Sequence, residues 1–340
     1  MKKIKVKQGT LAWEKLRAER IGGSEIFDVV RYYASDDELQ NCGVNAEDFR
    51  SEKPYTTAWA LYHKILNDGL YKKEALSPEL AEYGHAAEPY GVYILQKDRK
   101  NKLHPGEVYI DNLLIASLDI SGTAEEIDVR PFDFGNGMPK PGQKFVCEQK
   151  TMMPSIVKKG VPFKYIIQAQ YQIMMTKADF FILQIMVLKE DTPFIRGRIT
   201  EMTKKKRCCF LNENMTVKHL YFQNNQALAE LIKACIVRFF EAVKNKCEPV
   251  PFIEYDSQRN IIEAIRLNSL YNDEKVCDYD LSSYIKAKDD EDTSGLRRKA
   301  ELQKIVEAAM QNNACKFLSP DGSTAKFSKS GSFLVSEVVL

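Results

Sequence analysis

The sequence lacks several features that would assign it to a class at once. No stretch of its 340 residues reaches 18 uninterrupted apolar positions, so a membrane-spanning helix is excluded. The charged N-terminus, 1–7, has no apolar segment behind it and is not typical of a secretory signal. The eight cysteines include no C-x-x-C pair and no nearby histidine, which indicates reduced thiols rather than a disulfide framework or a zinc site. We therefore expect an intracellular protein of the cytoplasm.

Net charge is also nearly absent. The 49 lysines and arginines exceed the 47 aspartates and glutamates by only two, which neither requires nor excludes a nucleic-acid partner. The composition itself is that of a soluble globular protein, with 44% hydrophobic and 28% charged residues. The length suits one large domain or two ordinary ones.

Helix and strand patterns alternate along the first two hundred residues. Apolar residues at helical spacing predict helices, and the start signal Ser77-Pro78 predicts one more. Short apolar runs predict strands, two of them joined as a hairpin through Asp111-Asn112. The predicted helices are 12–30, 57–67, one from Pro78 and 165–175; the predicted strands are 108–110, 113–117, 144–150 and 180–188; a polar stretch, 35–53, and a loop, 131–142, lie between. This order predicts an α/β core.

Beyond residue 207 the pattern becomes mainly helical. Amphipathic helices are predicted at 227–243 and 296–312, with an acid-rich linker at 286–295 before the second. Asp-Gly at 321–322, between two short apolar runs, predicts a terminal hairpin. We therefore divide the chain into a core domain, 1–250, and a C-terminal extension, 251–340.

The predicted strand 144–150 carries the main candidate for chemistry. Side chains alternate along a strand, so Glu148 and Lys150 share one face while Gln149 lies on the other. Phosphodiester cleavage uses a carboxylate that holds a divalent metal and a lysine that steadies or helps deprotonate the attacking water. An acid-x-Lys tripeptide by itself is more often a solvated surface pair, but here the preceding strand is apolar on both faces.

A metal site needs a second acidic ligand, and Asp119 is the candidate. It follows the predicted strand 113–117 and precedes the small residues Ser121-Gly122, a position that a simple turn former also occupies. If the two strands are neighbours, Asp119, Glu148 and Lys150 form an Asp…Glu-x-Lys constellation. Its oxygen ligands suit Mg²⁺ or Mn²⁺ rather than zinc.

Polar residues on two predicted helices are further candidates. Glu88 falls on a stripe of small and apolar residues, where a carboxylate is costly unless it meets a cation or a metal. The alternative is a helix-edge glutamate paired with a lysine. Gln168 and Gln172 share one side of the helix 165–175, where they either bond a neighbouring helix or face a cleft.

Near the N-terminus, Arg17 precedes Gly22-Gly23 and Ser24. Ser24 is predicted to cap a helix, and a helix N-terminus beside an arginine is a natural phosphate pocket. An ordinary cap with Arg17 on the surface is the alternative.

Six short motifs connect these candidates. They are Trp13-x-x-Leu16-Arg17, Ile21-Gly22-Gly23-Ser24-Glu25, Gly84-x-x-x-Glu88, Ser117-Leu118-Asp119, Glu148-Gln149-Lys150 and Gln168-Ala169-Gln170-Tyr171. In identity and order they resemble the landmarks of the λ-exonuclease/YqaJ-type viral recombinase family, most densely from Gln8 to Leu188. The sequence departs from the family at Leu118-Asp119-Ile120, where Pro-Asp-Gly is usual, and at the polar Gln149, where an apolar residue is usual.

The resemblance implies a fold and a set of roles. The fold is the PD-(D/E)xK restriction-endonuclease-like α/β core, with a mixed central sheet flanked by helices, followed here by a C-terminal helical extension and a small hairpin. The implied roles are Mg²⁺ binding by Asp119, Glu148 and the backbone carbonyl of Gln149, catalysis by Lys150, a further active-site or second-metal carboxylate at Glu88, water or scissile-phosphate contact by Gln168, and 5′-phosphate binding by Arg17 and Ser24.

The activity implied is that of a Mg²⁺-dependent 5′-to-3′ exonuclease, with Mn²⁺ as a substitute. Such an enzyme degrades one strand of linear double-stranded DNA and leaves 3′ single strands for annealing recombination in a phage or prophage, here in the cytoplasm of the host cell. The family also implies a homo-oligomer, a trimer by analogy, and a single-strand annealing protein as partner. Two alternatives stay open: a structure- or site-specific endonuclease of the same fold, and a catalytically silent DNA-binding recombination scaffold.

Overall fold

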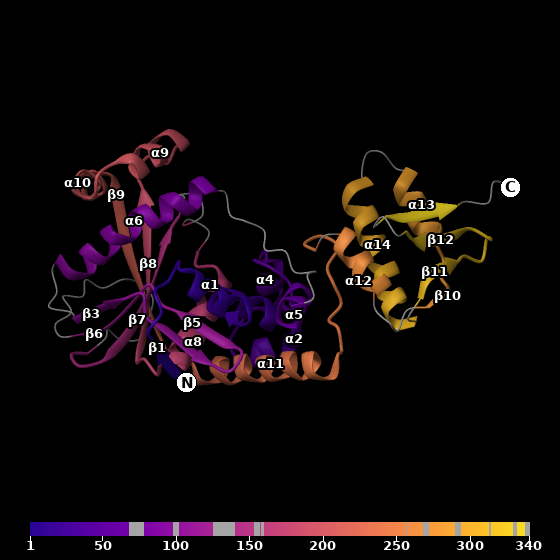
Figure 1. The fold of residues 1–340 in the computed structure, drawn as a ribbon, viewed down its shortest axis with the longest axis horizontal. Helices are drawn as coiled ribbons and strands as arrows, with labels where there is room; N and C mark the ends of the chain where they lie inside the picture. Colours follow the sequence, from indigo (N-terminus) through magenta and orange to yellow (C-terminus); the bar gives the residue numbers. More distant parts are fainter. Residues whose placement is uncertain are drawn as a thin grey trace. The chain divides into compact units, whose positions relative to one another are not determined.

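Figure 1 shows the computed structural model of the chain. It describes residues 1–67, 78–97, 102–124, 140–152, 157, 160–256, 258–267, 272–289, 294–312, 314–328 and 332–336. Its contacts divide the chain into two compact units, the first formed by Met1–Tyr55 with Lys73–Arg238 and the second by Thr56–Lys72 with Phe239–Leu340. The predicted domain boundary at 250/251 falls later in the chain than the division after Arg238. No local pattern in the sequence indicated that the segment Thr56–Lys72 groups with the C-terminal part.

The first unit contains a five-stranded mixed sheet. Its order is β3 (Lys102–Pro105), β6 (Ile120–Thr123), β7 (Lys144–Thr151), β8 (Phe180–Leu188) and β9 (Met215–Gln223). The pair β7–β8 is parallel and the other neighbours are antiparallel, so the expectation of a mixed central sheet is confirmed. The strands predicted at 144–150 and 180–188 are both present, and β8 is buried along almost its whole length.

Helices cover both faces of this sheet. The crossover from β7 to β8 is made by α8 (Phe163–Thr176), close to the predicted helix 165–175. The predicted helix from Pro78 is α6 (Pro78–Lys97), whereas its predicted cap, Ser77, lies outside the described residues. Glu148 contacts α8 through Gln172, and the next residue, Gln149, contacts α6 at Gly91. Because neighbouring residues of a strand point to opposite faces, α6 and α8 lie on opposite sides of β7.

A second, four-stranded sheet lies in the same unit, with the order β1 (Lys2–Ile4), β4 (Val108–Asp111), β5 (Leu114–Ser117) and β2 (Ile21–Gly22). The predicted hairpin is confirmed as β4 and β5, with Asn112 in the left-handed region at φ +51°.

The prediction of one helix over 12–30 is wrong. The segment instead forms α1 (Leu11–Ala18), strand β2, a 3₁₀ turn (Gly23–Glu25) and α2 (Ile26–Tyr33). Ile21 leaves the helical path because it joins the sheet, donating its backbone N–H to the carbonyl of Leu113 at 2.8 Å.

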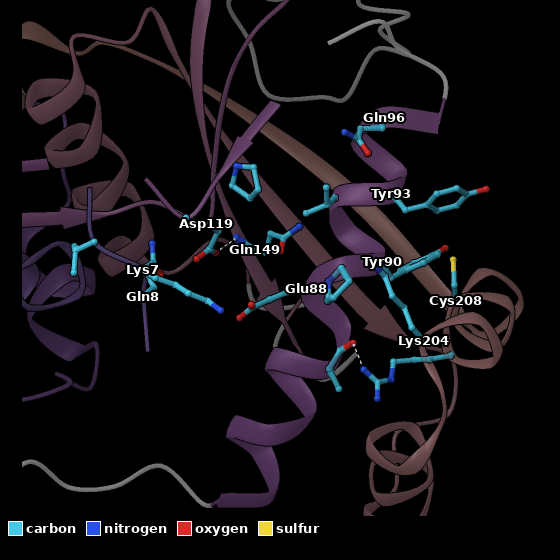
Figure 2. A pocket seen from close by; sticks show the side chains of 17 residues that line it. Lys7, Gln8, Glu88, Tyr90, Tyr93, Gln96, Asp119, Gln149, Lys204 and Cys208 are labelled. Atoms are coloured by element: carbon cyan, nitrogen blue, oxygen red, sulfur yellow. Dashed lines mark hydrogen bonds between the residues drawn. The ribbon is translucent and has the colours of Figure 1, made fainter. Parts of the chain in front are cut away.

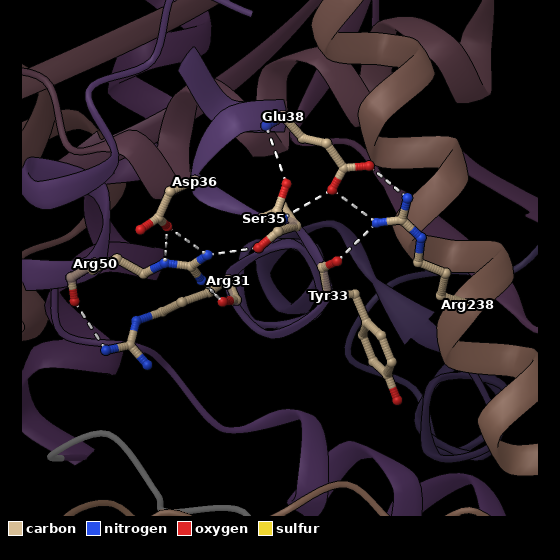
Figure 3. A network of polar contacts seen from close by, with 8 residues as sticks. Arg31, Tyr33, Ser35, Asp36, Glu38, Arg50 and Arg238 are labelled. Atoms are coloured by element: carbon tan, nitrogen blue, oxygen red, sulfur yellow. Dashed lines mark hydrogen bonds and ion pairs between the residues drawn. The ribbon is translucent and has the colours of Figure 1, made fainter. Parts of the chain in front are cut away.

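The polar stretch 35–53 forms two short helices, α3 (Asp36–Asn41) and α4 (Ala46–Ser51), capped by Ser35 and Asn45. Figure 3 shows the polar network that fixes them. Arg238 donates to Glu38 at 2.9 Å and to the backbone carbonyl of Tyr33 at 2.8 Å. The hydrogen bond from Arg238 lowers the pKa of Glu38 to about 2. The stretch is therefore an integral part of the first unit.

Three more helices follow β8, two of them before β9 and one after it. They are α9 (Pro193–Glu201), α10 (Lys204–Asn214) and α11 (Gln226–Asn245), the last of which confirms the helix predicted at 227–243. Arg207 of α10 donates to the backbone carbonyls of Ile199 and Ala86, and so ties α10 to α9 and α6.

The second unit has a core of its own. Its elements are α5 (Ala58–Leu66), α12 (Gln258–Leu267), β10 (Asn272–Asp278), α13 (Ser282–Asp289), α14 (Ser294–Asn312), β11 (Ala314–Leu318), β12 (Thr324–Phe327) and β13 (Phe333–Ser336). The predicted terminal hairpin is confirmed as β11 and β12, although it belongs to a four-stranded sheet, β10-β11-β12-β13. The start of the predicted linker, 286–289, belongs to α13, and 290–293 lie outside the described residues. Most of the predicted loop 131–142 also lies outside them.

No helix within the described ranges combines the length and the apolar character that crossing a membrane requires.

Candidate active site

Glu148 and Lys150 lie on one face of β7, as the alternation of side chains predicts. The Lys150 ammonium Nζ lies 2.6 Å from Oε1 of Glu148. The other carboxylate oxygen, Oε2, accepts a hydrogen bond from Nε2 of Gln172 at 3.0 Å. The Glu148 side chain is only 9% exposed and that of Lys150 24%, so this is not a solvated surface pair.

Asp119 reaches the same place from a different strand than the sequence suggested. The preceding strand β5 belongs to the other sheet, whereas Asp119 stands immediately before β6, the antiparallel neighbour of β7. Ile120 pairs with Cys147, so continuing the register sets Asp119 opposite Glu148. Its Oδ2 accepts the backbone N–H of Gln149 at 2.7 Å. Residues opposite each other in an antiparallel pair share a face with Cβ atoms about 5 Å apart.

The three charges influence one another. Burial and the nearby Glu148 carboxylate raise the pKa of Asp119 well above its usual value, against the opposing effect of Lys150. Burial alone would lower the pKa of Lys150, but the carboxylates of Glu148 and Asp119 raise it above its ordinary value. The Tyr165 ring lies 5.5 Å from the Lys150 ammonium and adds a cation–π contact. When all three groups are ionised, the two carboxylates exceed the one ammonium by a single negative charge.

Helix α8 lines the other side of this site. Gln168 and Gln172 lie one turn apart on it, and their Oε1 atoms are buried with no hydrogen-bond partner among the described residues. A buried unpaired amide oxygen is costly and needs an explanation, such as a ligand or water. The sequence analysis assigned no active-site role to Gln172. Its i, i+4 spacing from Gln168 in an otherwise apolar helix is the pattern that could have indicated such a role.

Arg17 and Ser24 lie together near the same helix. Nη2 of Arg17 donates to Oγ of Ser24 at 3.4 Å, and its guanidinium stacks over the Trp13 ring at 5.1 Å. Gly23, next to Ser24, lies against α8, since a Cβ there would lie 3.5 Å from Cγ of Gln168. The predicted cap is wrong, because Ser24 lies inside the 3₁₀ turn and α2 has no side-chain cap. Arg17 and Ser24 nevertheless lie within hydrogen-bonding distance of each other.

Glu88 is not on a core-facing stripe. The buried side of α6 is formed by Tyr83, Ala87 and Tyr90, while the Glu88 side chain is 46% exposed. Its Oε1 lies 3.0 Å from Nδ1 of His85, and among the described residues no lysine forms an ion pair with it. Figure 2 shows Glu88 pointing from α6 into the space that Asp119 also faces. Both line one pocket of about 900 Å³.

The face of β7 opposite Glu148 is neutral. Gln149 lies against α6, and its amide is 2.7 Å from that of Gln184 on β8. The helix approaches so closely that a Cβ at Gly91 would lie 2.1 Å from the Gln149 amide nitrogen. This packing fixes β7, and Gln149 offers the site only its backbone.

The donor set fits a magnesium ion. Within the part of the chain that the structure describes, no three His, Cys, Asp or Glu side chains form a ready-made metal cluster. Mg²⁺ does not require one, because it usually keeps several waters and binds through one or two carboxylates plus substrate phosphates. Asp119 and Glu148 supply two carboxyl groups, and a bound cation would favour the ionised form of both. These groups define a candidate site for metal-assisted hydrolysis on a mixed α/β fold.

Two solved structures to which this chain is similar are described as exonucleases. An alkaline exonuclease from Laribacter hongkongensis is 13% identical, with 70% of this chain and 94% of that chain covered and a TM-score of 0.41. A phage-related exonuclease from Haemophilus somnus 129PT is 11% identical, with 67% and 95% covered and a TM-score of 0.42. No family model and no curated protein sequence matches the chain.

Proposed function

We propose that the chain is a Mg²⁺-dependent nuclease that hydrolyses phosphodiester bonds of double-stranded DNA. The observation that carries the proposal is the meeting of Asp119, Glu148 and Lys150 at one end of the β6–β7 pair. A structural ion pair needs only one carboxylate, but here Asp119 adds a second carboxyl group beside Glu148 and Lys150, and burial and Glu148 raise its pKa. A bound divalent cation would favour the ionised form of both acids.

In this proposal Asp119 and Glu148 hold Mg²⁺, which when bound polarises the phosphate and lowers the pKa of a water. The carbonyl of Gln149 is a further ligand by the family resemblance. Lys150 keeps its ammonium beside the carboxylates and stabilises negative charge that develops on the phosphate oxygens. Gln168 accepts a hydrogen bond from the attacking water through its unpaired Oε1. Glu88 lines the same pocket as Asp119 and would be a carboxylate ligand of a second metal ion.

The direction of digestion rests on Arg17 and Ser24. We propose that they bind a 5′-terminal phosphate, because a guanidinium and a hydroxyl that already point at each other form a preorganised anion site. Hydrolysis of the next phosphodiester would then release a 5′-mononucleotide and leave a 3′ single strand. Assembly into a trimer, recombination in a phage or prophage, and an annealing partner are parts of the proposal that follow from the family resemblance alone.

A time course with end-labelled linear duplex tests the proposal. We expect Mg²⁺-dependent release of mononucleotides from the strand labelled at its 5′ end, sustained by Mn²⁺ and stopped by chelation. Closed circular duplex should survive, since it has no end. Cleavage of the closed circular duplex would overturn the exonuclease assignment in favour of the endonuclease alternative. If no nucleotide is released from any substrate, the catalytically silent scaffold is favoured.

A further inference from the structure

The pocket beside Asp119 extends well past the candidate active site. Its lining runs from Lys7, Gln8 and Asp119 on one side of α6 to Tyr93 and Lys204 on the other side of this helix (Figure 2). Its volume of about 900 Å³ is near the upper end of what proteins use for small-molecule ligands. It is too large for one phosphate and two metal ions, and too small for a DNA duplex. The part beyond Glu88 therefore has no role in the hydrolysis described above.

Aromatic rings form the wall of this part of the pocket. Tyr93 lines it with 39% of its surface exposed, and Tyr90 lies behind it, only 4% exposed, with the two ring centroids 6.2 Å apart. Tyr93 is therefore in contact with a buried ring. A half-exposed, supported tyrosine in a pocket is the platform on which a nucleic-acid base stacks.

Lysines stand on the two sides of the same pocket. Lys7 approaches from the N-terminal segment and Lys204 from α10, and both are exposed. Among the described residues, neither ammonium is paired with a carboxylate. Arg207 also lines the pocket, but its guanidinium is committed to backbone carbonyls. The cations available to a ligand are thus the two lysines, which suits a chain of phosphates rather than a neutral ligand.

We propose that this pocket binds a short stretch of single-stranded DNA next to the scissile phosphate, with one base stacked on Tyr93 and phosphates beside Lys7 and Lys204. The inference rests on the proposed function for the identity of the nucleic acid. Asp119 lines the pocket at one end, while Arg17 and Ser24 lie on the α8 side, so the scissile phosphate sits between the two. The pocket is a positioning site that holds the strand in register for the carboxylates.

Binding measured without hydrolysis tests the inference. In chelator, a short fluorescein-labelled oligothymidylate is titrated with the full chain and followed by anisotropy. Tyr93→Ala is expected to weaken binding about tenfold, because stacking on one aromatic ring contributes that much per base. Tyr93→Phe keeps the ring and should retain the wild-type affinity.

The lysines are tested by salt dependence. Replacing both Lys7 and Lys204 by Ala should lower the slope of log affinity against log salt by about 0.7 per lysine. The matched control replaces Lys5 and Lys205, which are exposed neighbours that do not line the pocket, and should leave the slope unchanged. Equal slopes for the two double variants would overturn the role of the lysines.

The outcomes also separate this inference from the proposed function. Equal affinity of wild type and Tyr93→Ala for the oligonucleotide overturns the pocket, whatever the nuclease assay gives. Loss of affinity in Tyr93→Ala, rescued in Tyr93→Phe, supports the pocket even if the wild-type chain releases no nucleotide, in which case only the proposed hydrolysis fails. If Tyr93→Ala loses as much affinity for blunt duplex as for the oligonucleotide, the site is not selective for single strands and the inference is overturned.

Discussion

Each of the two units contains a partly buried aspartate whose pKa is raised by burial. Asp119 accepts the backbone N–H of Gln149 at 2.7 Å, and Asp256 accepts that of Phe252 at 2.8 Å. The environments differ in what else is nearby. Asp256 also accepts the hydroxyl of Thr57 at 2.7 Å, whereas Asp119 faces a second carboxylate and an ammonium and lines a pocket.

The difference shows what separates a structural acid from a candidate catalytic one. Asp256 anchors the N-cap residue of α5, and its hydrogen bonds are satisfied within its own unit. Asp119 is pushed toward its neutral form by Glu148 as well as by burial, so its surroundings favour an added cation. Perturbed groups with a charged partner in a cleft mark functional sites more often than burial alone does.

The largest expected effect is the loss of hydrolysis when the ion pair on β7 is broken. Lys150→Ala should lower kcat on linear duplex by about 10²–10³-fold, the usual cost of removing one group that stabilises transition-state charge. Asp256→Asn is the matched variant in the other unit and should change kcat by less than about twofold. Initial rates at saturating Mg²⁺, with thermal unfolding to verify the fold, measure both.

Two results would remove the contrast between the aspartates. Near-wild-type kcat in a folded Lys150→Ala protein would show that hydrolysis occurs elsewhere. A large fall in kcat for a folded Asp256→Asn protein would mean that the second unit contributes directly to the chemistry.

The next largest effect concerns stability and pH at Asp256. Burial raises the pKa of this carboxyl from 3.8 to about 6 in the folded chain. Between these two values the folded state binds the additional proton, so its stability falls as the pH rises from 3.8 to about 6 and then stays level. Denaturant unfolding of wild type and Asp256→Asn across this range isolates the effect, because other acids cancel in the difference.

Asparagine stays neutral, and its oxygen and amide can replace both hydrogen bonds of the protonated acid. The stability of wild type relative to Asp256→Asn should therefore decline with rising pH, by at most about 3 kcal/mol. A difference that is flat across the range would show that Asp256 titrates normally and that its burial carries no cost.

The parts of the fold that were predictable from the sequence are those with local patterns. The apolar run of β8 and the helical spacing of α8 need no knowledge of distant partners. The same holds for the shared face of Glu148 and Lys150, since alternation follows from strand geometry alone.

The predictions that were wrong concern segments whose structure depends on residues distant in the sequence. Ser121-Gly122 looked like a turn after β5, yet both lie in β6, the strand that positions Asp119. Gly122 is required there because a Cβ would lie 2.8 Å from the Lys102 carbonyl oxygen and from the Phe145 ring. The break at Ile21 is likewise set by pairing with β5, more than 90 residues away. No local signal reports either contact.

The smallest expected effect concerns recognition of the 5′ end of the substrate. Within the described chain no arginine contacts Asp256, whereas the guanidinium of Arg17 contacts a hydroxyl and a ring but no carboxylate. Arg17→Ala should lower kcat/KM about tenfold on 5′-phosphorylated ends, the cost of one charge-assisted hydrogen bond, and hardly at all on 5′-hydroxyl ends. The ratio of kcat/KM on 5′-phosphorylated ends to kcat/KM on 5′-hydroxyl ends, measured for wild type and variant, separates loss of this contact from a general loss of activity. Equal losses on both ends would show that Arg17 supports the structure of the 3₁₀ turn and does not bind the terminal phosphate.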